Sequence, residues 1–310
     1  MSLASVSRRT VGRLFDNPYL LLALASLFWS GNHIVGRAIA GAVPPFTIST
    51  LRWLIGMVLL WPLARHRFAA DWPLIRRHWG ILLFLGATGG AMFSALQYVG
   101  LQLTTALNTS VFNSLAPVLI AAVGALMFRD RLTARQTLGI ATSLVGALAI
   151  VTRCDLATVA QLRFNLGDLV IVLNMAVFAV YAVYFRRRPP IHWLSFILLL
   201  SVVSALGTLP LMMWEMLAGA TVQWTAPTVL AIAYVAIFPS VGAFVFWNRG
   251  VEIIGANRAG VFLHLVPLYS ALLATALLGE QLRLYHVIGL ALILVGVKLA
   301  ARAPQPEPRG

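Results

Sequence analysis

The chain carries LAPVLIAAVGALMFRDRLT at residues 115–133 and LVPLYSALLATALLGEQL at residues 265–282, and each segment has a proline in third place followed by a long apolar run. When the sequence is compared with itself at an offset of 150 residues, residues 100–146 align with 250–296 without a gap. The identical residues include Gly100, Pro117, Gly139 and Gly146. A few leucine identities between the two segments could arise by chance, but several glycines and a proline aligned without a gap could not. The chain therefore contains an internal repeat.

The composition is that of a membrane protein. Of 310 residues, 60% are hydrophobic and 10% charged, and the mean hydropathy is +0.88. Apolar segments near the roughly 20 residues that cross a bilayer recur along the chain, without the alternation of barrel strands. The sequence predicts an all-α polytopic membrane protein with ten transmembrane helices, at 19–40, 46–65, 79–101, 105–128, 134–152, 168–186, 192–214, 226–249, 256–278 and 284–302.

The positive charges predict the orientation of these helices. Eighteen of the 23 Lys and Arg residues fall on the two termini and the loops after even-numbered spans, four fall on the opposite side, and Arg52 lies inside a span. Short cytoplasmic loops carry such an excess, so both termini are expected in the cytoplasm. The net charge of +14 is thus a signal of topology, and no nucleic-acid partner is expected.

The repeat divides the spans into two halves of five. Because five is odd, the second half must cross the membrane in the opposite sense. We expect a cytoplasmic N-terminal tail at 1–17, a first repeat at 18–152, a connecting loop at 153–167, a second repeat at 168–302 and a cytoplasmic tail at 303–310. Inverted repeats are typical of secondary transporters, whose substrate site lies near the midplane between the halves.

Polar residues in apolar spans mark candidate positions of that site, because an unpaired polar group in lipid is costly. In the segment NTSVFNSLAP, residues 108–117, Asn113 aligns with Leu263 and Ser114 with His264, so the repeat keeps an apolar frame and varies its polar positions. Aromatic residues one helical turn from such groups complete the set. The candidate substrate-binding residues are Trp29, Asn32, His33, Phe93, Gln97, Phe112, Asn113, Ser114, Phe178, Tyr181, Phe244, Trp247 and His264. A stripe such as Asn174, Phe178 and Tyr181 is most often part of the packed core, and ligand binding is the alternative.

Glycine and proline mark candidate hinges. Gly89-Gly90 aligns with Pro239-Ser240, and Pro117 with Pro267, which predicts bends at equal depth in both halves, although close packing also explains a glycine pair. Gly139, Ser143 and Gly146 share a helical face and favour helix packing. Arg52 is expected to snorkel outward in a structural role, with pairing to a ligand carboxylate as the alternative.

Acidic residues are expected only outside the membrane centre, with Asp168 and Glu215 at helix ends and Glu252 and Glu280 in loops. Proton coupling would then depend on His33 or His264, and a facilitative carrier is the simpler hypothesis. With one cysteine and no nucleotide or nucleophile motif, neither catalytic residues nor a metal or other cofactor is expected.

Several segments resemble the EamA family of the drug/metabolite transporter superfamily. They are Trp29-Ser30-Gly31-Asn32, PPFTISTLRWLIGMVLLWPL at 44–63, and the two segments quoted first. The likeness covers roughly residues 19–302 and implies ten helices, inverted repeats and alternating access through a central cavity. This family commonly has glycine where this chain has Ser30.

Within that family the chain looks most similar to YddG-type bacterial exporters. That likeness implies export of amino acids, aromatic ones preferred, and of aromatic cations such as methyl viologen, across the inner membrane. The expected partners are the small-molecule substrate and the lipid bilayer, with the chain as a monomer. Carriers of cationic drugs or nucleobases, a lipid scramblase, an intramembrane enzyme and a structural scaffold are the alternatives.

Overall fold

The computed structural model describes residues 17–104, 109, 112–155, 157, 165–278 and 283–301. In these ranges every regular element is helical, and the only β feature is an isolated bridge between Ala40 and Val43. Seven helices of the described part are long and apolar enough to cross a membrane, and two shorter apolar helices cover Ala116–Phe128 and Leu284–Ala300. The predicted C-terminal tail, most of the N-terminal tail and connecting loop, and Glu280 lie outside the described residues.

The described part of the first predicted half comprises α2 (Pro18–Ala38), α3 (Pro45–Arg77), α4 (Trp79–Gly86), the π-helix η1 (Ala87–Met92), α5 (Phe93–Leu103), α7 (Ala116–Phe128) and α8 (Ala134–Val151). The second comprises α10 (Leu166–Tyr184), the short 3-10 helix η2 (Phe185–Arg187), α11 (Trp193–Leu217), α12 (Ala226–Val235), the π-helix η3 (Ala236–Gly242), α13 (Ala243–Ile254), α14 (Ala256–Gly260), the 3-10 helix η4 (Val261–His264), α15 (Leu265–Leu278) and α16 (Leu284–Ala301).

Side chains at the helix ends explain where several helices begin. Asn17 caps α2 ahead of Pro18, whose fixed φ suits the first helical position. Thr133 with Gln136, and Asn165 with Asp168, form reciprocal capping boxes at α8 and α10. At the other end of a helix, Gly255 takes φ +80° after α13 and stops it.

Three predicted spans differ from the structure. The fourth was expected as one helix at 105–128, but among its described residues Ser114 and Leu115 form a turn and α7 begins only at Ala116. The second was expected to end at residue 65, but α3 continues to Arg77 through Pro62 and Pro73. The polar residues of 66–77 are compatible with a helix that leaves the membrane, so composition alone misplaced its end. The ninth was expected as one helix at 256–278, whereas a 3-10 segment, η4, interrupts it. Glu252, expected in a loop, lies in the last turn of α13.

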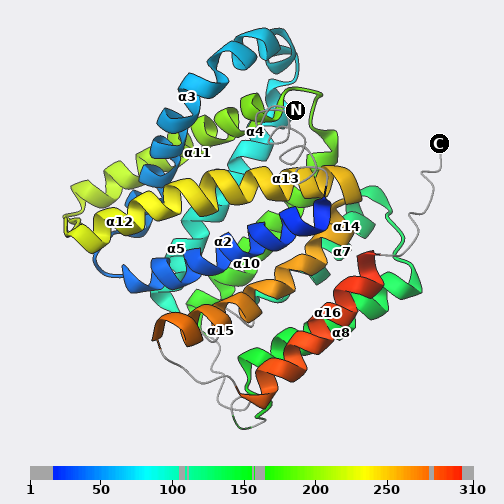
Figure 1. The fold of residues 1–310 in the computed structure, drawn as a ribbon. Coiled ribbons are helices and arrows are strands. Elements are labelled where there is room, and N and C mark those ends of the chain that lie inside the picture. Colours follow the sequence, from blue (N-terminus) through cyan, green and yellow to red (C-terminus); the bar gives the residue numbers. More distant parts are fainter. Residues whose placement is uncertain are drawn as a thin grey trace, which may run out of the picture.

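Figure 1 shows how the helices pair. α8 and α16 lie side by side at one edge of the bundle, and α3 packs along α11 at the other. α2 contacts α13 and α15, while α10 contacts α5 and α7. Each predicted half therefore contributes one helix, α2 or α10, that packs against helices of the other half.

The tryptophans separate into two groups. Six are exposed, as expected of tryptophans at membrane interfaces: Trp61, Trp72, Trp79, Trp193, Trp214 and Trp224. Trp29, Trp53 and Trp247 are buried in the main apolar core.

Candidate functional site

A small cavity of about 40 Å³ lies among the helices that the polar residues pointed to. Its lining residues come from both halves and are Trp29, Asn32, His33, Phe93, Gln97, Asn113, Ala116, Met175, Phe178, Leu263 and Val266. The volume holds a few water molecules at most. An amino acid would need the surrounding helices to move apart.

Aromatic rings form one wall of the cavity, with Trp29 at its centre. The Trp29 ring lies 5.5 Å from the rings of Phe178 and of Trp247, and Phe93 lies 4.9 Å from Phe178. The Trp29 indole N–H donates to the carbonyl of Pro239 at 3.2 Å, so the hydrogen bond fixes the ring against η3. These tilted and edge-on contacts are geometries that aromatic pairs prefer. The wall offers ring faces and edges to an apolar or aromatic ligand.

Amides supply the polar part of the lining. Asn174 donates to Gln97 Oε1 at 2.8 Å, and Gln97 Nε2 has no hydrogen-bond partner in the described part of the chain. Asn113 Nδ2 lies 3.4 Å from His33 Nε2, and Asn113 Oδ1 has no partner there either. Buried donors and acceptors without partners are uncommon and costly. One unused donor and one unused acceptor therefore border the cavity.

Arg52 lies beside this site, and the expectation that it snorkels outward was wrong. The residue is only 1% exposed. Its Nε donates to Ser240 at 2.6 Å and its Nη1 to the Tyr98 hydroxyl at 3.1 Å, and that hydroxyl donates to Asn32 Oδ1 at 2.7 Å. Two turns into α3, the side chain meets η3 and α5, and these polar partners hold it inside the protein.

The structure brings seven of the predicted residues to the cavity: Trp29, Asn32, His33, Phe93, Gln97, Asn113 and Phe178. Tyr181, Phe244 and Trp247 lie behind the aromatic wall and are fully buried. Phe112 and Ser114 are outside the lining. His264 is also outside it, because its Nδ1 meets Ser143 Oγ at 2.7 Å and its Nε2 meets the Ser114 carbonyl at 2.9 Å. Both imidazole nitrogens are thus engaged in joining helices.

Sequence reasoning missed Ala116, Met175, Leu263 and Val266, which also line the cavity. The repeat held the signal for two of them. Leu263 is the partner of Asn113 at the offset of 150, and Val266 is the partner of Ala116. A search restricted to polar and aromatic side chains passes over such apolar partners.

Three of the five predicted hinge residues fall in irregular helix segments. Gly89 and Gly90 lie in η1, and Pro239 lies in η3, so both π-helices occupy the same place in the repeat. A Cβ on Gly89 would stand 2.3 Å from a Tyr181 ring carbon, and one on Gly90 would stand 1.7 Å from Ser204 Oγ. Close packing therefore requires these glycines. Pro117 lies in the first turn of α7 and Pro267 in α15.

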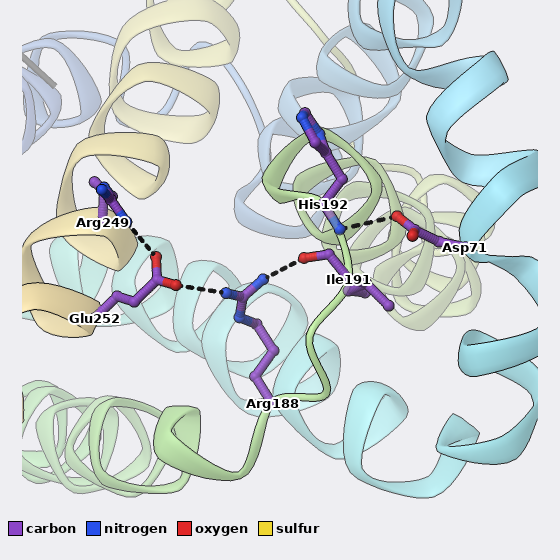
Figure 2. Close-up of polar contacts among 6 residues, drawn as sticks. All are labelled: Asp71, Arg188, Ile191, His192, Arg249 and Glu252. Atoms are coloured by element: carbon purple, nitrogen blue, oxygen red, sulfur yellow. Dashed lines mark hydrogen bonds and ion pairs between the residues drawn. The ribbon is translucent and has the colours of Figure 1, made fainter. Parts of the chain in front are cut away.

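A cluster of polar contacts, made by charged side chains and backbone groups, connects three helix ends outside the cavity, as Figure 2 shows. This helix-end cluster consists of Asp71, Arg188, Ile191, His192, Arg249 and Glu252. Arg188 donates to the Ile191 carbonyl at 2.9 Å and pairs with Glu252 at 3.3 Å, and Glu252 also pairs with Arg249 at 3.2 Å. Asp71 of α3 accepts the backbone N–H of His192 at 2.9 Å. The cluster ties α3 to the start of α11 and to the end of α13.

Glu215 connects the same two long helices at their other ends. Its carboxylate accepts the backbone N–H groups of Phe46 and Thr47 and the Thr47 hydroxyl, so it caps α3 from α11. In the described residues no three His, Cys, Asp or Glu side chains gather as a metal site would require. The lining instead offers stacking and hydrogen bonds, which suit reversible binding.

The comparisons with known proteins agree on a family. The sequence profile of the EamA-like transporter family matches residues 17–152 and 165–302. The chain is 25% identical over 301 residues to the uncharacterized transporter YyaM of Bacillus subtilis, covering 92% of this chain and 93% of that protein. It is 27% identical over 285 residues to an uncharacterized transporter of Archaeoglobus fulgidus, covering 91% and 96%.

A solved crystal structure has the same fold. It superposes with a TM-score of 0.75 and 22% sequence identity, over 93% of this chain and 98% of the other. The chain belongs to the EamA-like transporter family and is a multi-pass membrane transporter. Members of this family move solutes and are not enzymes.

Proposed function

We propose that this transporter carries amino acids, aromatic ones preferred, and related metabolites out of the cell across the bacterial inner membrane, by facilitative alternating access. Ten transmembrane helices form two inverted halves, 18–152 and 168–302, joined by the loop 153–167, with both terminal tails in the cytoplasm. The chain acts as a monomer. The observation that carries the proposal is a cavity lined from both halves by an aromatic wall and by amides with unused hydrogen-bonding atoms.

Residues that are partners in the repeat make equivalent contacts, which supports the inverted halves. Gly100 of α5 packs against Ile171 of α10, and its repeat partner Gly250 of α13 packs against Leu22 of α2. Each half thus gives the glycine of one contact and the large side chain of the other. Ser114 and His264, 150 residues apart, hydrogen-bond to each other. Two copies related by a two-fold axis make both reciprocal pairs of contacts and contacts between equivalent residues.

The position of the cavity fits this axis. Asn113 and its partner Leu263 both line it, as do Ala116 and its partner Val266. In transporters built from inverted repeats, the substrate lies between the repeats near the midplane. The two members of each pair differ chemically here, so a nearly symmetric frame has an asymmetric lining.

The chemistry of the lining supports an amino acid with a ring. Trp29, Phe93 and Phe178 provide surface for stacking, and Asn32, Gln97 and Asn113 provide hydrogen bonds for a zwitterion. The described lining contains no Lys or Arg, and phosphorylated substrates favour clusters of such residues. Aromatic cations remain the second candidate, because aromatic faces attract cations.

The small size of the cavity supports movement of the halves during transport. The roughly 40 Å³ of space is far below the ~300 Å³ of ordinary ligand pockets, so substrate entry requires helices to separate. The π-helices η1 and η3, at equal positions in the two halves, give each half a site of irregular backbone near the cavity. The helix-end cluster closes one end of the bundle, and Glu215 joins α3 and α11 at the other.

Uptake of labelled tryptophan into proteoliposomes without an imposed ion gradient tests the proposal. Saturable uptake that falls in Trp29→Ala and does not change with a pH step supports a facilitative amino-acid carrier. Uptake that requires a pH gradient replaces facilitation with proton coupling through His33. A protein that moves methyl viologen but no amino acid contradicts the amino-acid assignment.

Alternating access has a separate test. A cysteine at Asn113 in a Cys154→Ser background, labelled from each side of the membrane, reports which side reaches the cavity. Added substrate should protect this cysteine from labelling, both when the reagent is applied to one side of the membrane and when it is applied to the other. A scaffold that carries nothing gives no protection, and a scramblase leaves the position reactive throughout.

A further inference from the structure

We infer that Asn32 is the carboxylate subsite of this transporter and that the buried charge of Arg52 acts on it through Tyr98. The inference rests on the proposed amino-acid function and deepens it. It names which cavity residue receives the carboxylate, and it predicts that the carrier selects for a carboxylate over an amine.

The direction of the hydrogen bonds fixes how Asn32 is oriented. A guanidinium only donates, so the Tyr98 oxygen accepts from Arg52 Nη1 at 3.1 Å. The Tyr98 proton must then go to another acceptor, which lies 2.7 Å away on Asn32. That atom has to be Oδ1. The other end of the Asn32 amide is its NH₂ group, which is left to face the cavity that this residue lines.

The charge behind this chain is not neutralised in the described part of the protein. Arg52 is 1% exposed, its Nη2 has no hydrogen-bond partner, and its other partners are the neutral Ser240 and Tyr98. The described acidic side chains all bind elsewhere. Glu215 caps the start of α3, and Glu252 and Asp71 belong to the helix-end cluster. Asp130 pairs with Arg186, Asp155 accepts the Ala157 N–H, and Asp168 accepts the Asn165 N–H at the start of α10. A buried guanidinium keeps its charge, and without a counterion it favours an anion nearby.

The rest of the lining orients an amino acid around that anchor. A carboxylate at the Asn32 amide also suits the unused donor Nε2 of Gln97, on the facing helix α5. The unused acceptor Oδ1 of Asn113 suits the ammonium group. The ring then packs against Trp29 and Phe178. A carboxylate, an ammonium and a ring each have a complementary group from a different part of the lining.

Competition between three indole compounds tests the inference. Tryptophan carries both charged groups, 3-indolepropionate has only the carboxylate, and tryptamine has only the amine. In the wild-type protein, 3-indolepropionate should inhibit tryptophan uptake at least about tenfold more strongly than tryptamine, because a charge-assisted hydrogen bond contributes this much. Equal inhibition by both would overturn the inference.

Two variants locate the effect. Asn32→Asp keeps the acceptor for Tyr98 but places a negative charge at the cavity, so the preference should reverse in favour of tryptamine. Tyr98→Phe breaks the chain without changing the lining, so the preference for the carboxylate should shrink severalfold. Tyr184→Phe is the matched control, because it removes the hydroxyl of a partly buried tyrosine that packs against Phe84 and Phe128, away from this chain. It should keep the wild-type preference. A folded Asn32→Asp protein with an unchanged preference contradicts the role of Asn32.

The two proposals fail in different ways. If the protein does not transport tryptophan, the amino-acid function fails, but melting-temperature shifts of the purified protein with 3-indolepropionate and tryptamine still measure the preference. If tryptophan is transported and the two analogues stabilise the protein equally, only the carboxylate subsite fails. If a variant does not fold, the melting-temperature shifts of the wild-type protein with the two analogues still test the preference for a carboxylate.

Discussion

Gly146 of α8 packs directly on the backbone of Gly289 of α16, so closely that a Cβ on Gly146 would stand 2.7 Å from the Gly289 carbonyl oxygen. About two helical turns away, Gly139 packs on Gly296 in the same manner. At the repeat offset of 150, however, Gly139 corresponds to Gly289 and Gly146 to Gly296. The contacts are therefore crossed, as expected for two equivalent helices related by a two-fold axis.

The first prediction concerns this helix pair. Gly146→Ala should destabilise the protein by about 1–3 kcal/mol, because the added methyl group collides with backbone atoms that have no free rotamer. Thermal or denaturant unfolding in detergent measures the change. Gly80→Ala is the matched control, since a Cβ at that helical position meets nothing within 4 Å.

The control should be neutral or stabilise by a few tenths of a kcal/mol, because alanine is the better helix former. If both variants have the same melting temperature, α8 and α16 do not pack as closely as described.

The second prediction uses the asymmetry of the repeat. Asn113→Leu places at this position the residue that its partner, Leu263, already carries, so the fold should accept it. It removes the unused Oδ1 acceptor from the cavity and the contact with His33. The KM for tryptophan should rise about tenfold, since the lost hydrogen bond to a charged group is worth ~1.5 kcal/mol or more.

Met175→Leu provides the comparison for Asn113→Leu. It changes an apolar lining residue at nearly constant volume, which usually costs little. Transport kinetics in which the two variants behave alike would remove Asn113 from the site.

The third prediction concerns the helix-end cluster. Glu252→Gln removes the charge that pairs with both Arg188 and Arg249. An exposed ion pair contributes at most about 1 kcal/mol. Loss of that amount shifts the equilibrium between the closed and the open state of this end of the bundle roughly fivefold toward the open state. Labelling of a cysteine at Asn113 from the cytoplasmic side should accelerate by up to that factor.

Lys298→Gln serves as the control for that experiment, because it changes an exposed charge outside the cluster. An unchanged labelling rate in Glu252→Gln, or the same acceleration in both variants, would mean that the cluster does not hold this end of the bundle closed.

The fourth prediction is a pH dependence of stability. The His192 side chain caps α11 by accepting the Leu194 N–H at Nδ1, which requires an unprotonated nitrogen. Partial burial and then the charge of Arg67 lower the pKa of His192 below its ordinary 6.5, although Asp71 opposes them. The stability that this residue contributes is therefore present above about pH 6.5 and is lost as the pH falls through the lowered folded-state pKa.

Melting temperatures measured from about pH 8 down to about pH 5 should fall less steeply in His192→Asn than in the wild type. Asparagine keeps a capping oxygen that does not titrate in this range. Parallel curves for the two proteins would assign the pH dependence to other histidines.

Much of the cavity lining could be predicted from the sequence, for a physical reason. An amide or an imidazole inside an apolar span is costly, so its presence alone singles out Asn32, His33, Gln97 and Asn113. The apolar lining residues Met175 and Leu263 lack such a signal, because an exposed and a buried methyl group look alike in a sequence. His264 has the signal, but both of its ring nitrogens form hydrogen bonds that join helices. No sequence pattern distinguishes this role from ligand binding.

The sequence by itself determined the class of the fold and the apolar segments, because the cost of polar groups in lipid limits the composition of every membrane-spanning segment. It also determined the repeat, because the matching glycines and proline can be aligned without knowledge of the structure. Tertiary structure decided what each polar group meets. Arg52 illustrates the difference, since its position in a span suggested that it reaches outward, whereas Ser240 and Tyr98, 188 and 46 residues away, hold it inside. A long side chain has several directions open to it, and the helices packed around it select one.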